Sequence, residues 1–352
     1  MLEESLRIAH VAPVILPVPP QSYGGTERVI ADLAREQAAQ GHRVTLFAGR
    51  GSDVSGTTCI GSFDPLSVHE GRPAAGTTLP PGFPAVLEAI QLDDLLRHEG
   101  RFDIIHLHGP AQTSAAARAL KVPHVRTVHW RADEVDIALL CEAFPDERLI
   151  AISEAQARDV PKANLAGTVY HGLPLDRYSP GGGAGGYLAF LGRMTDQKRP
   201  DRAIAIAQTA GMPLRLAGPV DPGNPDYFAA HVEPSLGRDV TYVGSIGDSE
   251  KAVLLGNAAA LLFPIDWPEP FGLVMIEAMA MGTPVIAWSN GAAPEIVEDG
   301  VTGFLVESTG EAIRAVGRLG TLDRQRIRRC FEERFSAVRM AADYLSIYRM
   351  LV

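Results

Sequence analysis

Short apolar segments alternate with segments of helical character along the whole chain, and this alternation constrains the fold more than any other feature. A strand that is followed by a helix and then by another strand is typical of a parallel sheet covered by helices. The segments that we expect to be strands are residues 7–12, 43–48, 103–107, 124–128, 148–152, 168–170, 187–191, 214–216, 240–243, 260–263, 285–288 and 303–306. Helices are expected at 26–40, 85–100, 201–210, 249–258, 271–281 and 293–298, and over most of 311–352. The alternation therefore predicts an α/β protein with parallel sheets.

A glycine-rich run at residues 179–186 interrupts the alternation, which restarts after it. A chain of 352 residues exceeds the size of one ordinary domain. We therefore expect the run to begin the second of two domains, which would span residues 1–178 and 179–335. The run also fits the G-x-G-x-x-G dinucleotide pattern, but that motif has to open a helix, whereas this run precedes a strand. We therefore interpret it as a linker. Since ligands of open α/β sheets bind at the carboxyl ends of strands, we expect the two domains to line a cleft.

Composition argues against several classes of protein. The net charge of −10 argues against a nucleic-acid partner, because such partners are held by clustered cations. Cys59, Cys141 and Cys330 lie far apart in the sequence, which predicts free thiols in a reducing compartment. The first residues lack the basic and apolar regions of a signal peptide, and no uncharged apolar run approaches the roughly 18 residues that cross a membrane. We therefore expect a soluble, cytoplasmic protein without an integral membrane segment; its oligomeric state is left open.

The segment WPEPFGLVMIEAMAMG at residues 267–282 carries the strongest chemical signal. Pro268 and Pro270 flank Glu269 and fix its carboxylate in a loop. The helix that follows is apolar apart from Glu277, so this second carboxylate needs a polar partner. The first free N–H groups of the helix, together with its dipole, favour an anion such as a phosphate. The spacing therefore indicates a site for a sugar nucleotide.

Two further loops offer groups that suit a phosphate. Gly24 and Gly25 precede a helix and allow a backbone to approach a ligand closely, although a tight turn with a helix cap explains them equally well. Arg193 and Lys198 follow a strand and suit a diphosphate, with Arg as a fork and Lys as a point charge. Two cations in an isolated loop are more often surface ion pairs, but their position beyond the carboxyl end of a strand favours ligand binding.

Three histidines lie at strand ends in the first half of the chain. The rings of His106 and His108 lie on one side of a strand, which makes a metal pair conceivable. Because no carboxylate or thiolate ligand stands nearby in the sequence, we favour hydrogen-bonded histidines and predict no metal site. His129 follows the next strand, where it can contact a sugar hydroxyl or help to stabilise charge at a reacting carbon. A hydrogen-bonded histidine at a strand end explains His129 equally well.

These motifs resemble those of the GT-B glycosyltransferases, and in particular glycosyltransferase family 4. The resemblance covers nearly the whole chain, and its strongest element is the E-x7-E spacing from Glu269 to Glu277. Its further elements are GTPVIA at 282–287, PEIVEDGVTG at 294–303, Gly192 with Arg193, Lys198, and Gly24 with Gly25. The resemblance implies the GT-B fold, in which two Rossmann-like domains with parallel sheets face each other across a deep cleft. It also implies that a terminal helix, at 336–352, packs back on the first domain.

By this resemblance the second domain binds a nucleotide-sugar donor. Arg193 and Lys198 would hold the diphosphate of the donor. The start of the helix at 271–281 would bind the same group through its backbone. The residues of this helix start are Phe271, Gly272, Leu273 and Val274, of which Leu273 and Val274 would supply the N–H groups.

The resemblance also implies roles around the sugar and the ribose of the donor. Glu277 would bind the ribose hydroxyls, and Glu269 would bind hydroxyls near the anomeric centre. His129 would contact the donor sugar from the first domain, so His129 and Glu269 are the candidate catalytic residues. Gly24 and Gly25 would approach the donor phosphates from the first domain, which would bind the acceptor.

The activity that the resemblance implies is retaining transfer of a hexosyl unit to a sugar or another small, soluble hydroxyl acceptor, without a metal or other cofactor. UDP is favoured over GDP as the nucleotide because it is more frequent in the family. Since no obvious nucleophile faces Glu269, we favour front-face attack guided by the leaving phosphate over a covalent intermediate. The alternatives are a sugar-nucleotide epimerase or phosphorylase-like enzyme of the same fold, and a non-catalytic sugar-nucleotide-binding protein.

Two features depart from the family pattern. Many family members reach lipid acceptors through a basic amphipathic helix, whereas the helix expected at 85–100 is acidic, which argues against membrane docking. Its acidic residues are Glu88, Asp93, Asp94 and Glu99, whereas its basic residues are only Arg97 and His98. Residues 52–84 are rich in Gly, Pro, Ser and Thr, and we expect them to form a surface insertion that shapes the acceptor pocket.

Overall fold

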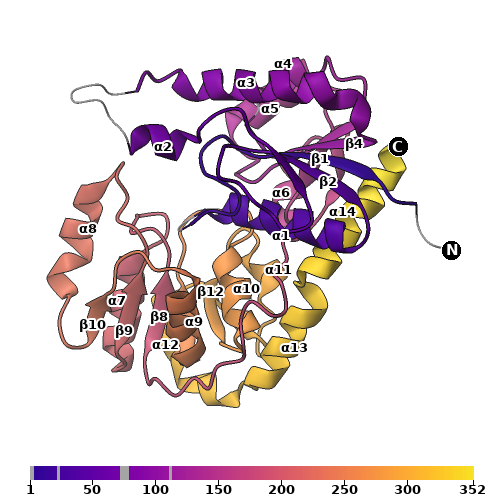
Figure 1. Ribbon diagram of the computed structural model, residues 1–352. Helices are drawn as coiled ribbons and strands as arrows, with labels where there is room; N and C mark the ends of the chain where they lie inside the picture. The colour runs from indigo at the N-terminus through magenta and orange to yellow at the C-terminus, as the bar shows by residue number, and fades with distance from the viewer. Residues whose placement is uncertain (1–3, 22–23, 72–78, 111–112) are drawn as a thin grey trace. The chain divides into compact units, whose positions relative to one another are not determined.

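The computed structural model describes residues 4–21, 24–71, 79–110 and 113–352 of the chain. The chain divides into two compact units, of which Met1–Tyr170 and Ala337–Val352 form the first and His171–Ser336 forms the second. Each unit has its own parallel sheet (Figure 1), as the alternation of strands and helices predicts.

The first unit contains a seven-stranded sheet in the order β3-β2-β1-β4-β5-β6-β7, in which every neighbouring pair is parallel. The strands are β1 (Arg7–Val11), β2 (Arg43–Phe47), β3 (Thr58–Ile60), β4 (Ile104–Leu107), β5 (His124–Thr127), β6 (Leu149–Ala151) and β7 (Leu165–Thr168). Strand β1 lies between β2 and β4, and its register places His10 opposite His106. The order of the strands thus joins segments that are far apart in the sequence.

Helices cover the sheet of the first unit. They are α1 (Gly25–Ala39), α2 (Leu66–Glu70), α3 (Phe83–His98), η1 (Glu99–Arg101), α4 (Ser114–Ala117), α5 (Val135–Ala143), α6 (Glu154–Ala157) and α14 (Ala337–Leu351). Helix α1 buries Val29, Ile30 and Leu33, which recur at helical spacing, and packs against α14. Leu95 of α3 packs into a hydrophobic core with residues of the sheet such as Phe47. The unit is therefore a layered α/β structure whose last helix comes from the end of the chain.

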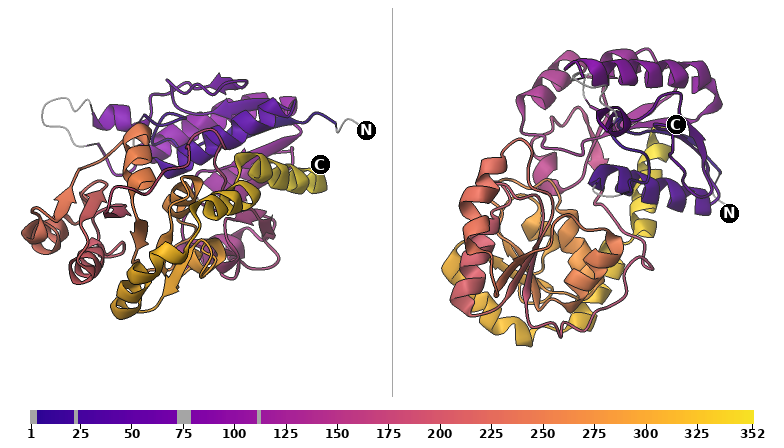
Figure 2. Two further views of the ribbon diagram at one scale, coloured as in Figure 1. Left: turned by 90° about the horizontal axis from the view of Figure 1, so that it is seen from below. Right: turned by 60° about the vertical axis from the view of Figure 1, so that its left-hand side comes forward.

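The second unit contains a six-stranded parallel sheet in the order β10-β9-β8-β11-β12-β13. The strands are β8 (Leu188–Leu191), β9 (Leu214–Ala217), β10 (Val240–Tyr242), β11 (Ala260–Phe263), β12 (Val285–Trp288) and β13 (Gly303–Val306). The helices are α7 (Pro200–Ala210), α8 (Pro225–His231), η3 (Glu233–Ser235), α9 (Asp248–Asn257), α10 (Leu273–Ala280), α11 (Ala293–Ile296), α12 (Thr309–Arg318), η4 (Leu319–Thr321) and α13 (Arg324–Arg334). Helices lie on both sides of this sheet (Figure 2).

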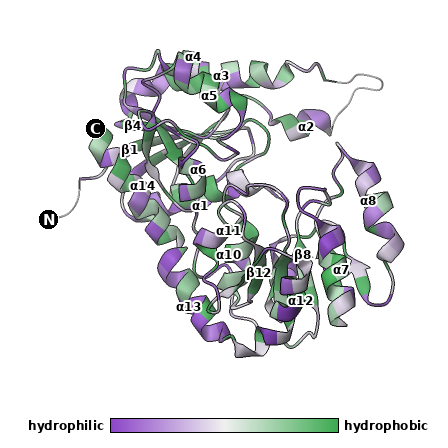
Figure 3. Cartoon of the chain, turned by 180° about the vertical axis from the view of Figure 1, so that it is seen from behind, coloured by the Kyte–Doolittle hydropathy of each residue, from purple (hydrophilic) through white to green (hydrophobic). Residues whose placement is uncertain are grey.

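The strands and the helices differ in how their apolar residues are distributed. The strands are mostly hydrophobic, whereas the helices carry hydrophobic and hydrophilic residues together (Figure 3). All four residues of β11 are buried, as expected for a central strand with both faces covered. Helix α7 buries Ile204 and Ala207 against this core, together with α12. No helix among the described residues is long and apolar enough to cross a membrane.

Each sheet has one point at which the strand order reverses direction. In the first unit this point lies between β1 and β4, and in the second it lies between β8 and β11. Chain segments that leave two such strands run to opposite sides, which opens a crevice at the carboxyl ends where ligands of α/β proteins bind. The two switch points therefore identify where each unit is built to hold a ligand.

The structure corrects the predicted boundary between the domains. The chain passes from the first unit to the second after Tyr170, and the glycine-rich run at 179–186 belongs to the second unit. The N–H groups of Gly181 and Gly183 donate to Met281 and Gly256. A Cβ atom at Gly181 would lie 2.1 Å from the carbonyl oxygen of Gly256, so the glycine is needed for close backbone packing. The run is a packed segment of the second unit.

Two predicted segments of the first unit also differ from the structure. Residues 52–84, which we expected to be a surface insertion, contain β3 at the edge of the sheet and α2; residues 72–78 of this stretch lie outside the described part of the chain. The strand expected at 168–170 is β7, which begins at Leu165. Both strands are short and lie at an edge, where one face lacks the apolar pattern that identifies a strand in sequence.

Candidate active site

The switch point of the second unit gathers most of the predicted donor-binding residues. Arg193 and Lys198 lie in the loop that follows β8, and Glu269 lies in the loop that follows β11. The Lys198 ammonium forms an ion pair with the Glu269 carboxylate. Both side chains are mostly buried, so this pair is shielded from solvent. The structure therefore brings together two residues that lie in separate motifs of the sequence.

Trp267 holds this ion pair in place, a role that sequence reasoning missed. Its indole N–H donates to Glu269 Oε2 at 2.7 Å. Its ring also lies under the Lys198 ammonium, which is 4.8 Å from the ring centroid, within the range of a cation–π interaction. An ammonium fixed by a carboxylate and an indole is preorganised to meet an anion at this crevice.

Arg193 lies in the same loop but has a different partner. Its guanidinium forms an ion pair with Asp221 at 3.7 Å, and its side chain is partly exposed. The structure thus places a second cation after β8, in an ion pair with the partly exposed carboxylate of Asp221. A partly exposed pair of this kind contributes little to stability.

Helix α10 begins after Gly272, which has a left-handed backbone conformation that other residues rarely adopt. Gly272 precedes the helix with φ 87°, and a Cβ atom there would lie 2.6 Å from Cε of Met275. Leu273 and Val274 are the first helical residues and are partly exposed, so their N–H groups are at an accessible helix start. Phe271 is buried, with its ring packed edge-to-face against His171 at 4.9 Å between ring centroids. The side chain of Phe271 therefore anchors the helix start in the core.

Glu277 finds the polar partner that its buried position requires. Lys251 of α9 donates to Glu277 Oε1 at 2.6 Å, and the Tyr178 hydroxyl lies 3.5 Å from the same oxygen. From the sequence we expected ribose hydroxyls to be the hydrogen-bond partners of the Glu277 carboxylate, and Lys251 was missed. The pair leaves Glu277 Oε2 as the oxygen that can accept from a ligand.

A second glycine near Glu269 also escaped the sequence analysis. Gly291 has φ 57°, and a Cβ atom there would lie 2.3 Å from the backbone nitrogen of Glu269. The Ala292 N–H donates to the Glu269 carbonyl at 2.9 Å. The loop after β12 thus packs directly on the backbone of Glu269 and fixes the position of its carboxylate.

In the first unit Gly24 serves close packing. A Cβ atom at Gly24 would lie 2.8 Å from Cδ1 of Leu16 and 2.9 Å from Cβ of Pro20. Gly24 precedes α1, and Gly25 is its first residue, so the helix begins one residue before the predicted start. Gly24 therefore allows the loop that contains Leu16 and Pro20 to pack against the start of α1. Residues 22–23 lie outside the described part of the chain.

His129 is the last ring of a chain of three hydrogen-bonded histidines. His129 Nε2 lies 2.9 Å from His108 Nδ1, and His108 Nε2 lies 2.9 Å from His10 Nδ1. His10 Nε2 lies 2.7 Å from Oε1 of Gln37 in α1. Because the amide oxygen can only accept, His10 carries its proton on Nε2, and each following ring must then donate from Nε2 as well. The Gln37 amide thus sets the tautomer of His129.

Burial keeps these rings neutral. It lowers the pKa of His10 to about 4, and it also lowers the pKa of His129. Sequence reasoning identified His108 and His129 but missed His10 and Gln37. His10 joins this cluster because β1 pairs in parallel with β4. A sequence pattern alone does not reveal which strands are neighbours, so His10 could not be found from the sequence.

His106 belongs to the same cluster but to a different network. Its Nδ1 lies 2.5 Å from the Tyr348 hydroxyl and its Nε2 lies 2.7 Å from Oγ1 of Thr127, which in turn lies 3.0 Å from the Tyr344 hydroxyl. Tyr344 and Tyr348 come from α14, so His106 and Thr127 fix the end of the chain to the sheet. The ring of His106 is therefore a buried attachment point for α14.

His10, His106 and His108 also have the spacing of metal ligands, since one ligand atom of each lies within 4.8 Å of the others. All six ring nitrogens of these residues already have hydrogen-bond partners in the protein. The 2.9 Å between His10 Nδ1 and His108 Nε2 is shorter than the roughly 3.3 Å that separates two ligands of a tetrahedral zinc ion. The geometry is that of a hydrogen-bond network.

The chain is similar to known proteins over most of its length. The family models described as Glycosyltransferase Family 4 and Glycosyl transferases group 1 match residues 23–177 and 184–327. A D-inositol 3-phosphate glycosyltransferase of Mycobacterium sp. (strain KMS) is 32% identical over 252 residues, which cover 60% of this chain and 57% of that protein. The chain thus spans little more than half the length of this relative.

Two solved structures are similar over almost the whole chain. One is AviGT4, a glycosyltransferase involved in avilamycin A biosynthesis, with 25% identity, a TM-score of 0.72 and 98% of both chains covered. The other is HepE of Anabaena in complex with UDP-glucose, with 18% identity, a TM-score of 0.71, and 98% of this chain and 100% of that chain covered.

Two parallel-sheet α/β units with these neighbours define the class of GT-B proteins. Within this class, the two family models together match most of the sequence, and the chain belongs to glycosyltransferase family 4. The predicted fold class and the family resemblance are thereby confirmed.

Proposed function

We propose that the protein is a retaining, metal-independent glycosyltransferase that moves a hexosyl unit from a nucleotide-diphosphate sugar to a sugar or another small hydroxyl acceptor. The observation that carries this proposal is the ammonium of Lys198, held between Glu269 and Trp267 at the switch point of the second unit. Arg193 and the start of α10 supply further positive charge around the same crevice. UDP is the favoured nucleotide and GDP is the second candidate, and the UDP-glucose complex of HepE supports this order.

In the proposed reaction the bond between C1 of the sugar and the β-phosphate oxygen breaks, and its electron pair stays on the phosphate. Lys198, Arg193 and the N–H groups of Leu273 and Val274 stabilise the charge that develops there. The acceptor hydroxyl attacks C1 from the same face and gives its proton to the departing phosphate oxygen, so the configuration is retained. The Glu269 carboxylate orients the sugar hydroxyls and holds Lys198 in position.

The remaining residues bind and orient the donor. Glu277, fixed by Lys251, is proposed to accept from the ribose hydroxyls. His129, whose tautomer is set through His108 and His10, is proposed to contact the donor sugar. Gly24 and Gly25 are proposed to let the backbone of the first unit approach the phosphates. A cytoplasmic location is part of the same proposal.

The proposal is tested by incubating the protein with UDP- and GDP-sugars and measuring both thermal stabilisation and release of nucleoside diphosphate, with and without a panel of sugars and inositols. Binding followed by acceptor-dependent release of UDP is the expected result. Conversion of one UDP-sugar into its epimer would favour the epimerase alternative. Stabilisation by UDP-sugars without any turnover would favour a sugar-nucleotide-binding protein.

Chelation of metals is expected to leave turnover unchanged. The positive charges at the crevice come from side chains and a helix start, which together meet the charge of the diphosphate. Acceptor-dependent release of UDP is measured before and after treatment with EDTA, with a metal-dependent glycosyltransferase treated in parallel. Loss of activity that Mn²⁺ restores would contradict the metal-free reaction.

Replacement of His108 by Phe is expected to lower kcat by about tenfold or more, because small misplacements of a reacting group cost up to about 10²-fold. The change breaks the link between His129 and His10 and releases the tautomer of His129. Long-range ¹⁵N NMR of the imidazole rings reports this tautomer directly. The matched control is His106→Phe, which removes an equally buried ring that has no bond to His129. An unchanged His129 tautomer in His108→Phe would contradict the relay.

A further inference from the structure

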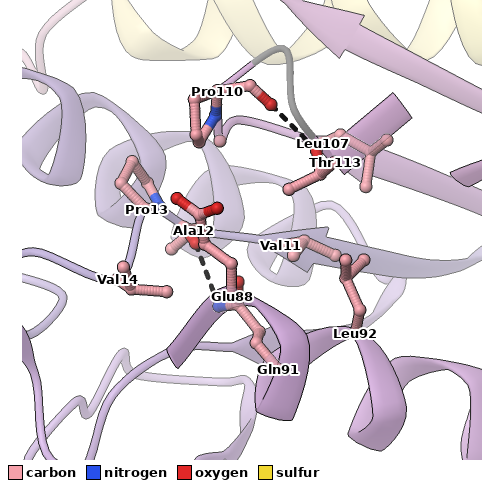
Figure 4. A pocket seen from close by; sticks show the side chains of 11 residues that line it. Val11, Ala12, Pro13, Val14, Glu88, Gln91, Leu92, Leu107, Pro110 and Thr113 are labelled. Carbon is pink, nitrogen blue, oxygen red and sulfur yellow. Dashed lines mark hydrogen bonds between the residues drawn. The ribbon is translucent and has the colours of Figure 1, made fainter. Parts of the chain in front are cut away.

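The switch point of the first unit contains a small pocket that the proposed donor site does not use. The pocket is lined by the segments that follow β1 and β4, at residues 11–14 and 107–110, and by one face of α3. Figure 4 shows the Glu88 carboxylate directed from α3 toward these two segments. This is the crevice position at which an α/β sheet holds a ligand.

Glu88 is the polar group of this pocket that the protein leaves for a ligand. Its side chain is more than nine-tenths buried, with a residue exposure of 7%. Within the described ranges of the chain, no hydrogen-bond donor or ion-pair partner lies within bonding distance of its carboxylate. Burial raises the pKa of Glu88, and the charge of Arg126 acts in the opposite direction. A mostly buried carboxylate without a partner in the described protein is an acceptor that a ligand can satisfy.

The other polar side chains that line the pocket, among the described residues, already have hydrogen-bond partners. Gln91 donates through its amide nitrogen to the carbonyl groups of Ala12 and Phe47, at 2.9 and 3.0 Å. Thr113 donates to the Pro110 carbonyl at 2.9 Å, and Arg126 donates to the same carbonyl at 3.0 Å. These bonds fix the walls of the pocket and leave the carboxylate of Glu88 as its open acceptor.

The chemistry of the pocket restricts what can enter it. The free space admits about one water-sized group, so the pocket holds a single functional group of a larger molecule. The open side-chain atoms are the carboxylate oxygens of Glu88, so a group that binds to them must donate a hydrogen bond. A phosphate or carboxylate would face the Glu88 carboxylate and is repelled. The remaining walls include Val14 and Leu92, which suit the carbon atom that carries a hydroxyl.

We propose that this pocket binds one hydroxyl group of a neutral polyol acceptor, with the Glu88 carboxylate accepting its hydrogen bond. The inference rests on the proposed glycosyl transfer and names the acceptor chemistry of the first unit. It places the neutral, hydroxyl-bearing edge of the acceptor at Glu88 and any anionic group of the acceptor elsewhere.

The test uses the full chain and the variants Glu88→Leu, Glu88→Gln and Asp93→Asn. Asp93 lies on the same helix, is exposed and pairs with Arg97, so its variant is the matched control for loss of a negative charge on α3. Binding of myo-inositol, methyl α-D-glucopyranoside, glucosamine and inositol 3-phosphate is measured by saturation-transfer NMR without donor. Where a probe accepts sugar from UDP-glucose, its KM and the KM of UDP-glucose are measured as well.

The wild-type protein and Asp93→Asn are expected to bind at least one neutral polyol. Glu88→Leu is expected to lose this signal and to raise the acceptor KM by about tenfold or more, while the KM of UDP-glucose stays the same. Its Tm is expected to rise, because an unpartnered buried carboxylate is replaced by an apolar side chain. Glu88→Gln keeps an acceptor atom and is expected to show a smaller loss of acceptor binding than Glu88→Leu.

A fall in Tm with unchanged polyol binding in Glu88→Leu would identify a structural role and overturn the inference. Binding of glucosamine alone would assign the pocket to amines, and the absence of any polyol signal in the wild type would also overturn it. Failure of the proposed glycosyl transfer is recognised separately, because UDP-sugars would then neither stabilise the protein nor be turned over. Polyol binding is measured without donor and does not depend on that result.

Discussion

Replacement of Lys198 by Met is expected to lower kcat/KM for a UDP-sugar by about 10²–10³-fold, the size of effect seen when one preorganised group is removed from a developing negative charge. The ammonium is held by the Glu269 carboxylate and the Trp267 ring, so no other cation in the loop after β8 can take its place without rearrangement. The measurement is release of UDP at several donor concentrations, together with the affinity for UDP from calorimetry.

The control for this variant separates loss of binding from loss of folding. Lys198→Met leaves the Glu269 carboxylate mostly buried without its cation, so the variant is also expected to have a lower Tm. The double variant Lys198→Met with Glu269→Gln removes the orphan charge and is expected to recover Tm without recovering affinity for UDP. If Lys198→Met bound UDP as the wild type does, the proposed role of Lys198 in holding the diphosphate would be wrong.

Replacement of Lys251 by Met is expected to destabilise the second unit by about 3 kcal/mol, because it leaves Glu277 as an unpaired carboxylate inside an apolar helix. For a unit of this size, such a loss corresponds to a fall in Tm of roughly 6–12 °C. Differential scanning calorimetry measures this fall, and the variant Lys251→Met with Glu277→Gln is expected to recover most of it.

Lys162→Met serves as the matched control for Lys251→Met, since it removes the same ammonium from an exposed position of the first unit. Its Tm is expected to stay within about 1 °C of the wild type. An equal fall in Tm for both lysine variants would show that overall charge, and not the pair with Glu277, determines stability.

The sequence predicted the central strands well and the partners of the charged residues poorly. Strands such as β11 are short apolar runs between helices, and that local pattern suffices to locate them. The need of Glu277 for a polar partner was also readable, because its neighbours in the helix are apolar. Its partner Lys251 lies on another helix, and only the packing of α9 against α10 brings the two together.

Glu88 and the glycine-rich run illustrate two kinds of misreading. The sequence shows Glu88 only as one charged residue of an acidic helix, whereas in the structure it shares a face with Leu87, Gln91 and Leu95, which are all buried. The run at 179–186 was interpreted as a linker because glycine is typical of flexible segments. Gly181 instead allows two backbones to pack, a constraint that depends on Gly256 and has no local signature.

The return of α14 to the first unit has a consequence for synthesis of the protein. Because His171–Ser336 forms the second unit and Ala337–Val352 completes the first, the unit that begins earlier on the ribosome is completed later. Tyr344 and Tyr348 reach Thr127 and His106 only after the second unit has been made in full. The polar cluster beneath α14 therefore lacks two of its hydroxyl partners while the second unit is being synthesised. During this period the incomplete first unit is a candidate for binding by chaperones.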